Sequence, residues 1–396
     1  MKPTIFAKLS LMMLLEYFIW GAWYVTMGTY MTTFLQSSGV QIGAAYSALA
    51  IATMISPFFV GMVADRFFSA QRILGVLHVA GAGMLYLATQ ITNNNIFYWI
   101  ILVYSLLYMP TIALSNSIAF HQMSDPGKQF PWIRVFGTVG WIIAGTLISS
   151  LGLDKSAITF NMAAIASLAL GLLSFALPNT PPKGKTTESA LGTEAFVLFK
   201  DKPYLIFFIA AILICIPLAF YYSFANVFFN ALGMTNVAFK MTFGQVSEAL
   251  FILAIPFLFN RIGVKNMLLL GMSAWVLRYV FFAFGNIDAN IWMLYAGIIL
   301  HGICYDFFFV TGYMYTEKKA GEKIKNAAQG LFTFATYGVG MVIGSRFSGM
   351  AADYYTTEGV RQWQSIWYVP AGIAAVVLLC FIFFFKEKKN PGTIQQ

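Results

Sequence analysis

The sequence predicts an all-α polytopic membrane protein with twelve transmembrane helices in two pseudo-symmetric six-helix bundles. First, 59% of the 396 residues are hydrophobic and only 10% are charged, against roughly 25% charged residues in a soluble domain. Second, residues 17–64 and 73–124 contain no Asp, Glu, Lys or Arg, and each stretch can hold two bilayer-spanning helices of roughly 20 residues. Third, basic residues gather in alternate connections, as the positive-inside rule describes.

The first part of the chain is predicted to form six membrane-spanning helices. Polar or turn-rich pieces separate them, with the sequences QSSGVQIG, DRFFSAQR, TNNN, SDPGKQFP and LDKS. The first apolar segment, residues 7–35, is too long for the core of a signal peptide and contains Glu16, so we expect it to remain as the first helix. Residues 1–178 are therefore predicted to form the N-terminal six-helix bundle.

The longest polar connection, residues 179–203, is predicted to be a cytoplasmic linker. It starts with the Pro-, Gly- and Thr-rich piece NTPPKGKTT and ends in a short amphipathic piece near residues 195–199. Six further helices fit between residues 204 and 385, with breaks near ALGMTN, NRIGVKN, GNIDAN, EKKAGEKIKN and DYYTTEGVRQ. Residues 204–396 are thus expected to form the C-terminal six-helix bundle with a short basic cytoplasmic tail.

The basic residues predict how the chain lies in the membrane. Most of the 24 Lys and Arg residues fall in the connections on one side, and only Lys155, Lys240 and Arg361 fall in connections on the other. Basic residues accumulate on the cytoplasmic side of membrane proteins, and an even number of spans returns the chain to its starting side. Both termini are therefore expected in the cytoplasm. The net charge of +9 reflects this orientation rather than binding to nucleic acid.

A few ionisable residues lie inside the predicted spans. A charge at the bilayer centre costs roughly 2.5–3.5 kcal/mol on insertion scales, so such residues usually mark function. They are Glu16, Arg134, Glu248, Arg278, Asp306 and Arg346. Arg278 and Arg346 are expected to be structural, paired with a carboxylate or with carbonyl groups. Glu16 is left open between an internal hydrogen bond and a place in a cavity, whereas Glu248 and Asp306 are expected to be functional.

Several of these charges have polar or aromatic neighbours at helical spacing. Arg134, Thr138 and Trp141 stand at i, i+4 and i+7, which places a cation, a hydroxyl group and a large ring on one stripe of a helix. This combination is typical of a site for a polar solute that contains a ring. Gln245 and Glu248, at i and i+3, place an amide and a carboxylate on one face. These two groups can bind vicinal hydroxyl groups or the edge of a base.

Tyr305 and Asp306 stand in the aromatic piece YDFFFVTG. Aromatic faces near a carboxylate suit a flat ligand, and stacking is worth roughly 1–3 kcal/mol per base in nucleic-acid binders. Apolar surroundings also penalise the charged form of a carboxyl group. Asp306 and Glu248 are therefore candidates to take up and release a proton during transport.

The arrangement of six spans, a basic linker and six spans resembles the major facilitator superfamily, in which two related halves enclose a substrate site near the membrane midplane. GMVADRFFSAQR, residues 61–72, is similar to the signature between the second and third helices of that superfamily. The resemblance implies a structural charge clasp formed by Asp65, Arg66 and Arg72. The match is partial, because residues 68–70 stand where the signature usually has Gly and basic residues.

Segments along most of the chain resemble the nucleoside:proton symporter family of that superfamily. They include WGAWYVTMGTYM at residues 20–31, FPWIRVFGTVG at 130–140, QVSEALFILAIPF at 245–257, AWVLRYVFFAFG at 274–285 and YDFFFVTG at 305–312. The resemblance implies that nucleoside binding and proton coupling involve Arg134, Thr138, Gln245, Glu248, Tyr305 and Asp306. Trp141 takes the place of a Phe one turn beyond Thr138.

Two features depart from this family pattern. In the seventh helix, Ala219 and Tyr222 stand where family members have polar amides. Tyr221, Tyr222 and Asn226 are candidates to rebuild the lost contacts, and we include Tyr222 and Asn226 among the predicted substrate-binding residues. In the first helix, Glu16 is an additional acid and a further candidate for proton coupling.

The resemblance therefore implies a secondary active transporter that imports nucleosides by proton symport through alternating access in a bacterial inner membrane. Its expected partners are a nucleoside, protons and the lipid bilayer, and the working unit is expected to be a monomer. No enzymatic activity, cofactor, metal site or nucleic-acid partner is predicted. The three histidines, His78, His121 and His301, show no ligand spacing and are expected to pack in the core or at helix interfaces.

Three alternatives stay open. A sugar or oligosaccharide:proton symporter of the same fold would stack Trp141 on a pyranose, and free nucleobases would then not compete with its substrate. A membrane-embedded enzyme would need a metal cluster, a nucleophile motif or a phosphate loop, none of which the sequence contains. A sensor without transport would need an output domain, whereas the polar connections are short.

Overall fold

The computed structural model describes residues 2–182 and 193–386. Within these ranges, it describes only the backbone of residues 58, 59, 61, 62, 64–66, 127, 256 and 260. The end of the predicted basic tail lies outside this range. The described chain is almost entirely helical, as predicted.

The N-terminal helices begin and end where the sequence places polar breaks. They are α1 (Pro3–Tyr24), α2 (Met27–Thr33), α3 (Gly39–Arg66), α4 (Ala70–Ala88), α5 (Asn94–His121), α6 (Pro126–Ser150) and α7 (Ile158–Ser174). Polar caps explain several starts. Ser38 and Gln41 form a capping box at α3, and the Asn93 side chain accepts hydrogen bonds from the N–H groups of Asn95 and Ile96 at α5.

The second half of the chain adds longer and more irregular elements. They are η1 (Thr193–Lys200), α8 (Lys202–Ala231), α9 (Val237–Phe284), α10 (Ile291–Ile299), α11 (His301–Tyr305), the π-helical η2 (Asp306–Val310), α12 (Thr311–Thr333), the π-helical η3 (Phe334–Gly340), α13 (Met341–Tyr354) and α14 (Trp363–Phe384). Helix α9 changes direction at Gly263, with φ of 75°, and α12 does so at Gly321, with φ of 66°. Such positive φ values favour glycine. Both kinks fall in predicted breaks, so each element contains the end of one span and the start of the next.

The helix lengths agree with a multi-pass membrane protein. Ten described helices are long and apolar enough to cross a membrane. One of them, Ile291–Tyr354, runs through the kink at Gly321, and the shorter apolar helix Ile158–Ser174 packs against α4. Counting the kinked helix as two crossings and the short helix as one is consistent with the twelve predicted spans.

A small β-hairpin connects α13 with α14, where the sequence analysis expected only a break. Strands β1 (Thr356–Thr357) and β2 (Val360–Arg361) pair antiparallel. The connecting residues Glu358 and Gly359 have φ of 51° and 78°, and two-residue hairpin turns require such positive φ values. The Glu358-Gly359 pair could have indicated the turn from the sequence, but the strands are too short to show an alternating pattern of apolar and polar residues.

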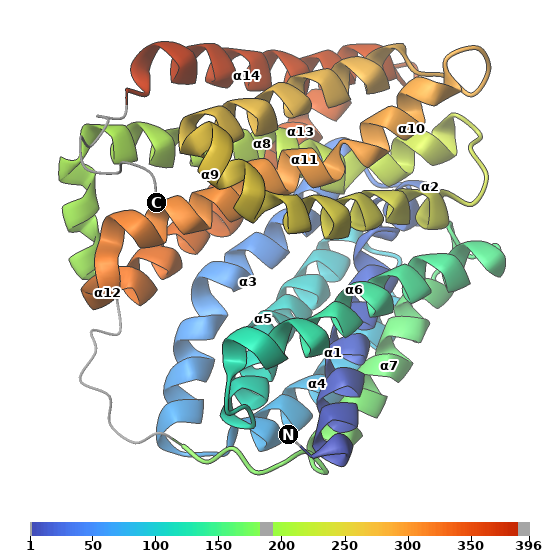
Figure 1. The fold of residues 1–396 in the computed structure, drawn as a ribbon. Helices are drawn as coiled ribbons and strands as arrows, with labels where there is room; N and C mark the ends of the chain where they lie inside the picture. Colours follow the sequence, from blue (N-terminus) through green and yellow to red (C-terminus); the bar gives the residue numbers. More distant parts are fainter. Residues whose placement is uncertain (1, 183–192, 387–396) are drawn as a thin grey trace.

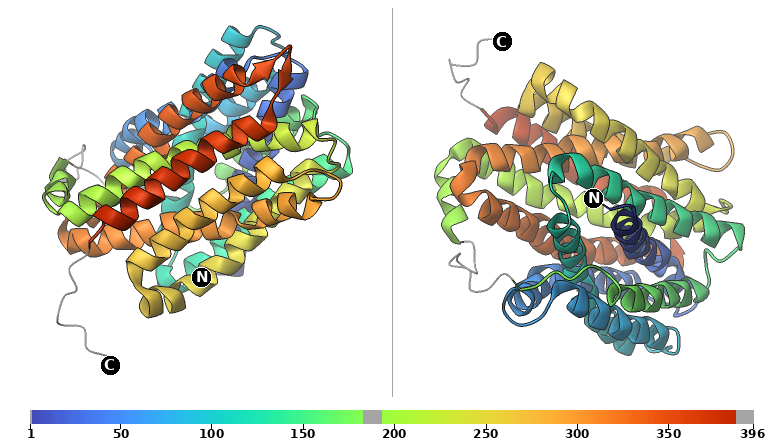
Figure 2. Two further views of the ribbon diagram at one scale, coloured as in Figure 1. Left: turned by 90° about the horizontal axis from the view of Figure 1, so that it is seen from above. Right: turned by 60° about the horizontal axis from the view of Figure 1, so that its bottom comes forward.

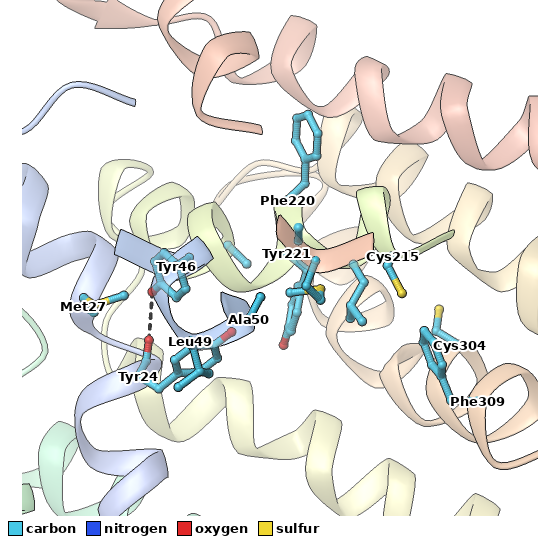
Figure 3. Packing of buried hydrophobic residues seen from close by; sticks show 14 of the residues in the cluster. Tyr24, Met27, Tyr46, Leu49, Ala50, Cys215, Phe220, Tyr221, Cys304 and Phe309 are labelled. Atoms are coloured by element: carbon cyan, nitrogen blue, oxygen red, sulfur yellow. Dashed lines mark hydrogen bonds between the residues drawn. The ribbon is translucent and has the colours of Figure 1, made fainter. Parts of the chain in front are cut away.

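The break between α1 and α2 is held by one tyrosine, shown in Figure 3. The Tyr46 hydroxyl group donates a hydrogen bond of 2.8 Å to the Tyr24 carbonyl oxygen and accepts one of 3.1 Å from the Gly28 N–H group. These are backbone groups that a helix end leaves unpaired. Tyr46 therefore satisfies two backbone groups at the break in the first span.

The helices form two groups, α1–α7 and α8–α14, which meet on the right of Figure 1 and diverge toward the left. The right-hand view of Figure 2 shows the same two groups from another direction. The groups touch mainly through α3 with α13 and η3, through α6 with α9, and through α2 with α8. Glycine permits two of these approaches. A Cβ atom on Gly43 would lie 2.2 Å from the Ser345 carbonyl oxygen, and one on Gly145 would lie 2.9 Å from that of Ala238. We call α1–α7 the N-terminal half and α8–α14 the C-terminal half.

Two carboxylates connect the halves at the end where they meet. Asp353, at the end of α13, accepts hydrogen bonds from the N–H groups of Gly39 and Val40 at the start of α3, with 2.8 Å to the Val40 nitrogen. Asp154 accepts one of 2.7 Å from the N–H group of Ala238 at the start of α9. A helix start has unpaired N–H groups and a partial positive charge, so each carboxylate caps a helix of the other half. We call these contacts the inter-half caps and this end the closed end.

Removing both inter-half caps is expected to open the closed end. A carboxylate at a helix N-terminus stabilises it by about 1 kcal/mol, so losing both charges in the double variant Asp154→Asn and Asp353→Asn should shift the ratio of closed to open forms roughly 30-fold. Spin labels at Leu151 and Ile287, exposed positions of the two halves near this end, measure the opening as a longer distance by pulsed electron paramagnetic resonance.

Asp125→Asn is the matched control for this experiment. Asp125 caps its own helix α6 by accepting a hydrogen bond from the Lys128 N–H group, so its loss should leave the label distance unchanged. The exposed Cys380 is replaced by Ser in all samples to keep labelling specific. An unchanged distance distribution in the double variant would refute a role of the caps in closure.

Candidate functional site

A pocket lies between the two halves, just inside the closed end. It is lined by Gly21 and Val25 of α1, Trp141 and Gly145 of α6, Tyr221 and Tyr222 of α8, and Ala238, Met241 and Gln245 of α9. Three predicted substrate-binding residues, Trp141, Tyr222 and Gln245, are among them. The pocket is therefore formed jointly by both halves.

On the side of the N-terminal half, the pocket lies beside the predicted stripe of residues on α6. Because α6 is helical throughout Pro126–Ser150, Arg134, Thr138 and Trp141 share one side of it. The guanidinium carbon of Arg134 lies 4.0 Å from the centroid of the Tyr17 ring, in cation–π contact. A Cβ atom on Gly21 would lie 3.1 Å from the Trp141 ring, so the glycine makes room for this indole.

The C-terminal wall is set by a close crossing of α9 with α11. A Cβ atom on Gly302 would lie 2.6 Å from the Glu248 backbone nitrogen, and one on Gly244 would lie 3.1 Å from the His301 Cβ atom. Small residues at such crossings let membrane helices approach closely. The crossing places His301 beside Glu248, with 3.7 Å between Nε2 and Oε2.

Arg278 lies behind His301 in the core of the C-terminal half and is fully buried. It contacts the Nδ1 atom of His301 and the ring of Tyr221, whose centroid lies 3.6 Å from the guanidinium carbon. Cys304 also interacts with Arg278 through its side chain, and among the described residues no partner of Arg278 is the carboxylate or carbonyl group that the sequence led us to expect. Arg346, the other arginine expected to be structural, donates a hydrogen bond of 3.0 Å to Ser47 of the opposite half.

Charges of opposite sign approach one another across the site. Arg134 and Glu248, from opposite halves, lie close enough to attract each other, whereas Glu248 and Asp306 carry charges of the same sign and repel each other when both are ionised. Asp306 is fully buried, and neither of its carboxylate oxygens has a hydrogen-bond partner among the described residues. An isolated buried charge is very costly, so a proton or a cation must accompany this carboxylate.

Tyr305 and Asp306 lie where the tenth span leaves regular α-helix. Asp306 begins η2, and π-helical turns are frequent at functional sites. The Tyr337 hydroxyl group, in η3, donates a hydrogen bond to the Tyr305 hydroxyl group. The irregular parts of two successive spans are therefore joined directly beside the carboxylates.

Of the predicted substrate-binding and proton-coupling residues, those that are not among the residues lining the pocket are Glu16, Arg134, Thr138, Asn226, Glu248, Tyr305 and Asp306. Two of them, Glu16 and Asn226, have hydrogen-bond partners elsewhere in the protein. Glu16 is fully buried in the N-terminal half, where Oε2 lies 3.0 Å from His78 Nε2 and Oε1 accepts a hydrogen bond of 2.6 Å from Thr111. Asn226 accepts a hydrogen bond of 2.6 Å from Thr29 across the halves. Their roles in proton coupling and substrate binding stay predictions.

The predicted charge clasp falls largely outside what the structure describes. The side chains of Asp65 and Arg66 are not described, and Arg72 is exposed at the start of α4. The clasp therefore stays a prediction.

Sequence reasoning missed two residues of the site, Tyr17 and His301. Tyr17 stands one turn from Gly21 on the first span, and this spacing could have identified it as a residue of the site. His301 was expected only to pack, and no local pattern connects it with Glu248, because their proximity arises from the glycine crossing. His121, also expected to pack, is exposed.

The site can bind a polar molecule that contains a flat ring. Arg134, Thr138 and Gln245 form no side-chain hydrogen bond with other described residues, so their donors and acceptors are available beside the pocket rings. Among the described residues, no group of three or more His, Cys, Asp and Glu side chains can hold a metal ion. The arrangement therefore favours binding through hydrogen bonds, stacking and charge.

Comparison with known proteins gives one consistent result. A family model described as "Nucleoside H+ symporter" matches residues 3–390. YegT of Escherichia coli (strain K12) is 43% identical, over 99% of this chain and 96% of its own length. The xanthosine permease of the same organism is 38% identical, over 99% and 98%.

A solved structure shows the same fold. The crystal structure of the nucleoside transporter NupG matches with a TM-score of 0.90 and 34% sequence identity, covering 97% of this chain and 100% of that chain. NupG of Escherichia coli (strain K12) is also 34% identical by sequence, over 96% of both chains.

Proposed function

This chain belongs to the nucleoside H+ symporter family of the major facilitator superfamily, and we propose that its nucleoside binds in the pocket lined by Trp141, Tyr222 and Gln245. The protein is a secondary active transporter that imports nucleosides together with protons through alternating access. One observation carries the proposed site: hydrogen-bonding side chains from both halves lie beside aromatic rings where the halves meet.

Each side chain has a distinct role in the proposed complex. The base stacks on Trp141, which is worth about 1–3 kcal/mol. Gln245 and Glu248 bind the ribose hydroxyl groups, because an amide and a carboxylate one turn apart offer a donor and several acceptors. Arg134 and Thr138 bind the polar edge of the base from the other half.

The remaining predicted residues complete this proposal. Tyr222 contributes a ring from α8, and Tyr305 contributes one beside Asp306. Glu248 and Asp306 exchange the transported proton, since two nearby carboxyl groups cannot both ionise without mutual repulsion. Asn226 contacts Thr29 in the described conformation, so in our proposal it contributes to the nucleoside site only when the halves rearrange.

We also propose the orientation and setting of the molecule. In this proposal both termini lie in the cytoplasm, which the positive-inside rule supports, the membrane is a bacterial inner membrane, and the closed end lies at the opposite face. The described conformation is then closed to the outside. The working unit is a monomer surrounded by lipid, because both walls of the pocket come from one chain.

The proposal is tested by uptake of labelled uridine and adenosine into proteoliposomes, with and without an inward proton gradient. Gradient-stimulated uptake that nucleosides inhibit and free sugars do not is the expected result. Competing nucleobases and 2′-deoxynucleosides separate base recognition from sugar recognition. Inhibition by sugars with no effect of bases would instead identify a sugar:proton symporter and contradict the proposed site.

A further inference from the structure

His301 connects a buried cation with the Glu248 carboxylate, which stands one turn along α9 from the pocket residue Gln245. Arg278 NH1 lies 3.0 Å from His301 Nδ1, and His301 Nε2 lies 3.7 Å from Glu248 Oε2. The His301 side chain is 2% exposed and that of Glu248 is 34% exposed. The three groups therefore form a chain from the core of the C-terminal half to its accessible surface.

The contact with Arg278 determines where the imidazole carries its proton. A guanidinium group only donates hydrogen bonds, so His301 Nδ1 must accept and carries no hydrogen. The imidazole is then neutral, with its hydrogen on Nε2. This N–H group is the one nearest to the Glu248 carboxylate.

The charge of Arg278 has no carboxylate partner within hydrogen-bond distance among the described residues. Aromatic rings face the guanidinium group instead, with centroids 3.6–5.6 Å away, and such faces attract cations. They are Tyr221, Trp275 and Phe282. The positive charge therefore polarises His301 and strengthens its Nε2–H group as a donor toward Glu248.

We propose that His301 is a positioning residue for Glu248, which holds the ionised carboxylate toward α11 and releases it when Glu248 takes up a proton. This inference rests on the proposed role of Glu248 in proton-coupled nucleoside transport. At 3.7 Å the Nε2–H group is too far from Oε2 for a hydrogen bond, but its partial positive charge still attracts the ionised carboxylate more than the neutral acid. Proton uptake then frees Glu248 from this position beside α11.

Other groups also act on the Glu248 carboxylate. Electrostatic interactions reach it from Tyr17 and Arg134 in the N-terminal half, from Tyr221 and Tyr222 in α8, and from Tyr305 and Asp306 in the tenth span. Among the Lys, Arg and His side chains of the described residues, His301 is the one with a nitrogen within 4.0 Å of a Glu248 oxygen, and the separation is 3.7 Å. Removing its Nε2–H group should therefore weaken the ionised state specifically.

Two substitutions separate the two ends of the imidazole. His301→Asn keeps an acceptor near the position of Nδ1 for Arg278 but is too short to reach Glu248. His301→Gln places an amide N–H group near the position of Nε2. With His301→Asn, the pH of half-maximal gradient-driven uridine uptake should rise by roughly 0.5–1 unit, because Glu248 then keeps its proton to higher pH. With His301→Gln, the pH profile should stay close to that of the wild type.

Arg278→Gln provides a second test. The Gln amide can still donate to His301 Nδ1 and so preserves the imidazole tautomer, but it carries no positive charge. It should raise the half-maximal pH in the same direction as His301→Asn. His121→Asn is the matched control, because His121 is exposed at the end of α5, and it should have the wild-type profile.

The outcomes distinguish this inference from the proposed function. A wild-type protein without gradient-driven nucleoside uptake would refute the function itself. If the wild type transports and both His301→Asn and Arg278→Gln have the half-maximal pH of the wild type, only the positioning role is refuted. An equal rise in His301→Asn and His301→Gln would also refute it, because packing and not the Nε2 donor would then be the cause.

Discussion

Replacing Glu248 with Gln is expected to reduce gradient-driven nucleoside uptake roughly 2–30-fold at low substrate concentration. The amide cannot ionise, so the exchange of a proton at this position is lost. A hydrogen bond to a charged group contributes about 1.5–3 kcal/mol, against about 1 kcal/mol for a neutral one, and each 1.4 kcal/mol is roughly tenfold in affinity. Initial rates of labelled uridine uptake, measured across a range of pH, should be low and nearly independent of pH.

Two companion variants make the Glu248 result specific. Glu248→Asp keeps an ionisable group at a shorter reach, so its uptake should be weaker than wild type but still dependent on pH. Glu317→Gln is the matched control, since Glu317 is exposed on α12 and bonded to Gln329. Full proton-driven uptake with unchanged affinity in Glu248→Gln would exclude the proposed role.

Replacing Asp306 with Asn is expected to uncouple nucleoside transport from the proton gradient. The amide has nearly the same shape, so the fully buried position should tolerate it, but it cannot bind a transported proton. One coupled proton supports at most about tenfold accumulation per unit of pH gradient, and the variant should lose this accumulation. Exchange of labelled for unlabelled nucleoside across the membrane should persist, because binding and alternating access do not require the gradient.

Asp288→Asn serves as the control for Asp306→Asn. Asp288 is exposed in the connection between α9 and α10, so accumulation should be that of the wild type. If Asp306→Asn accumulated nucleoside against a gradient as the wild type does, proton coupling would have to be assigned to another group.

Most of the fold was predictable because membrane helices leave strong signals in the sequence. Long uncharged stretches and glycine-containing polar breaks located the spans, and both kink glycines, Gly263 and Gly321, lie in breaks that the sequence analysis named. The β-hairpin around Glu358 was missed because its strands have two residues each. The π-helical turns were missed too, since they depend on packing between neighbouring spans and not on a residue pattern.

The candidate site was predictable where its residues share one helix. Arg134, Thr138 and Trp141 needed only helical spacing, as did Gln245 and Glu248. The sequence could not show that His301 lies beside Glu248, because this contact depends on how closely two helices cross. For the same reason, it could not decide whether Asn226 faces the pocket or the opposite half.

The pair formed by Glu16 and His78 also has an electrical consequence. Ser167 Oγ donates to the His78 carbonyl oxygen at 2.9 Å, so at 3.1 Å it accepts from Nδ1, which must carry a hydrogen. One further proton lies between Nε2 and the Glu16 carboxylate, and the pair has zero net charge whichever group holds it. A membrane potential does work of about 2.3 kcal/mol per elementary charge per 100 mV, but none on a neutral pair. In this form, Glu16 lies within the membrane without adding to the charge that the electric field moves in each transport cycle.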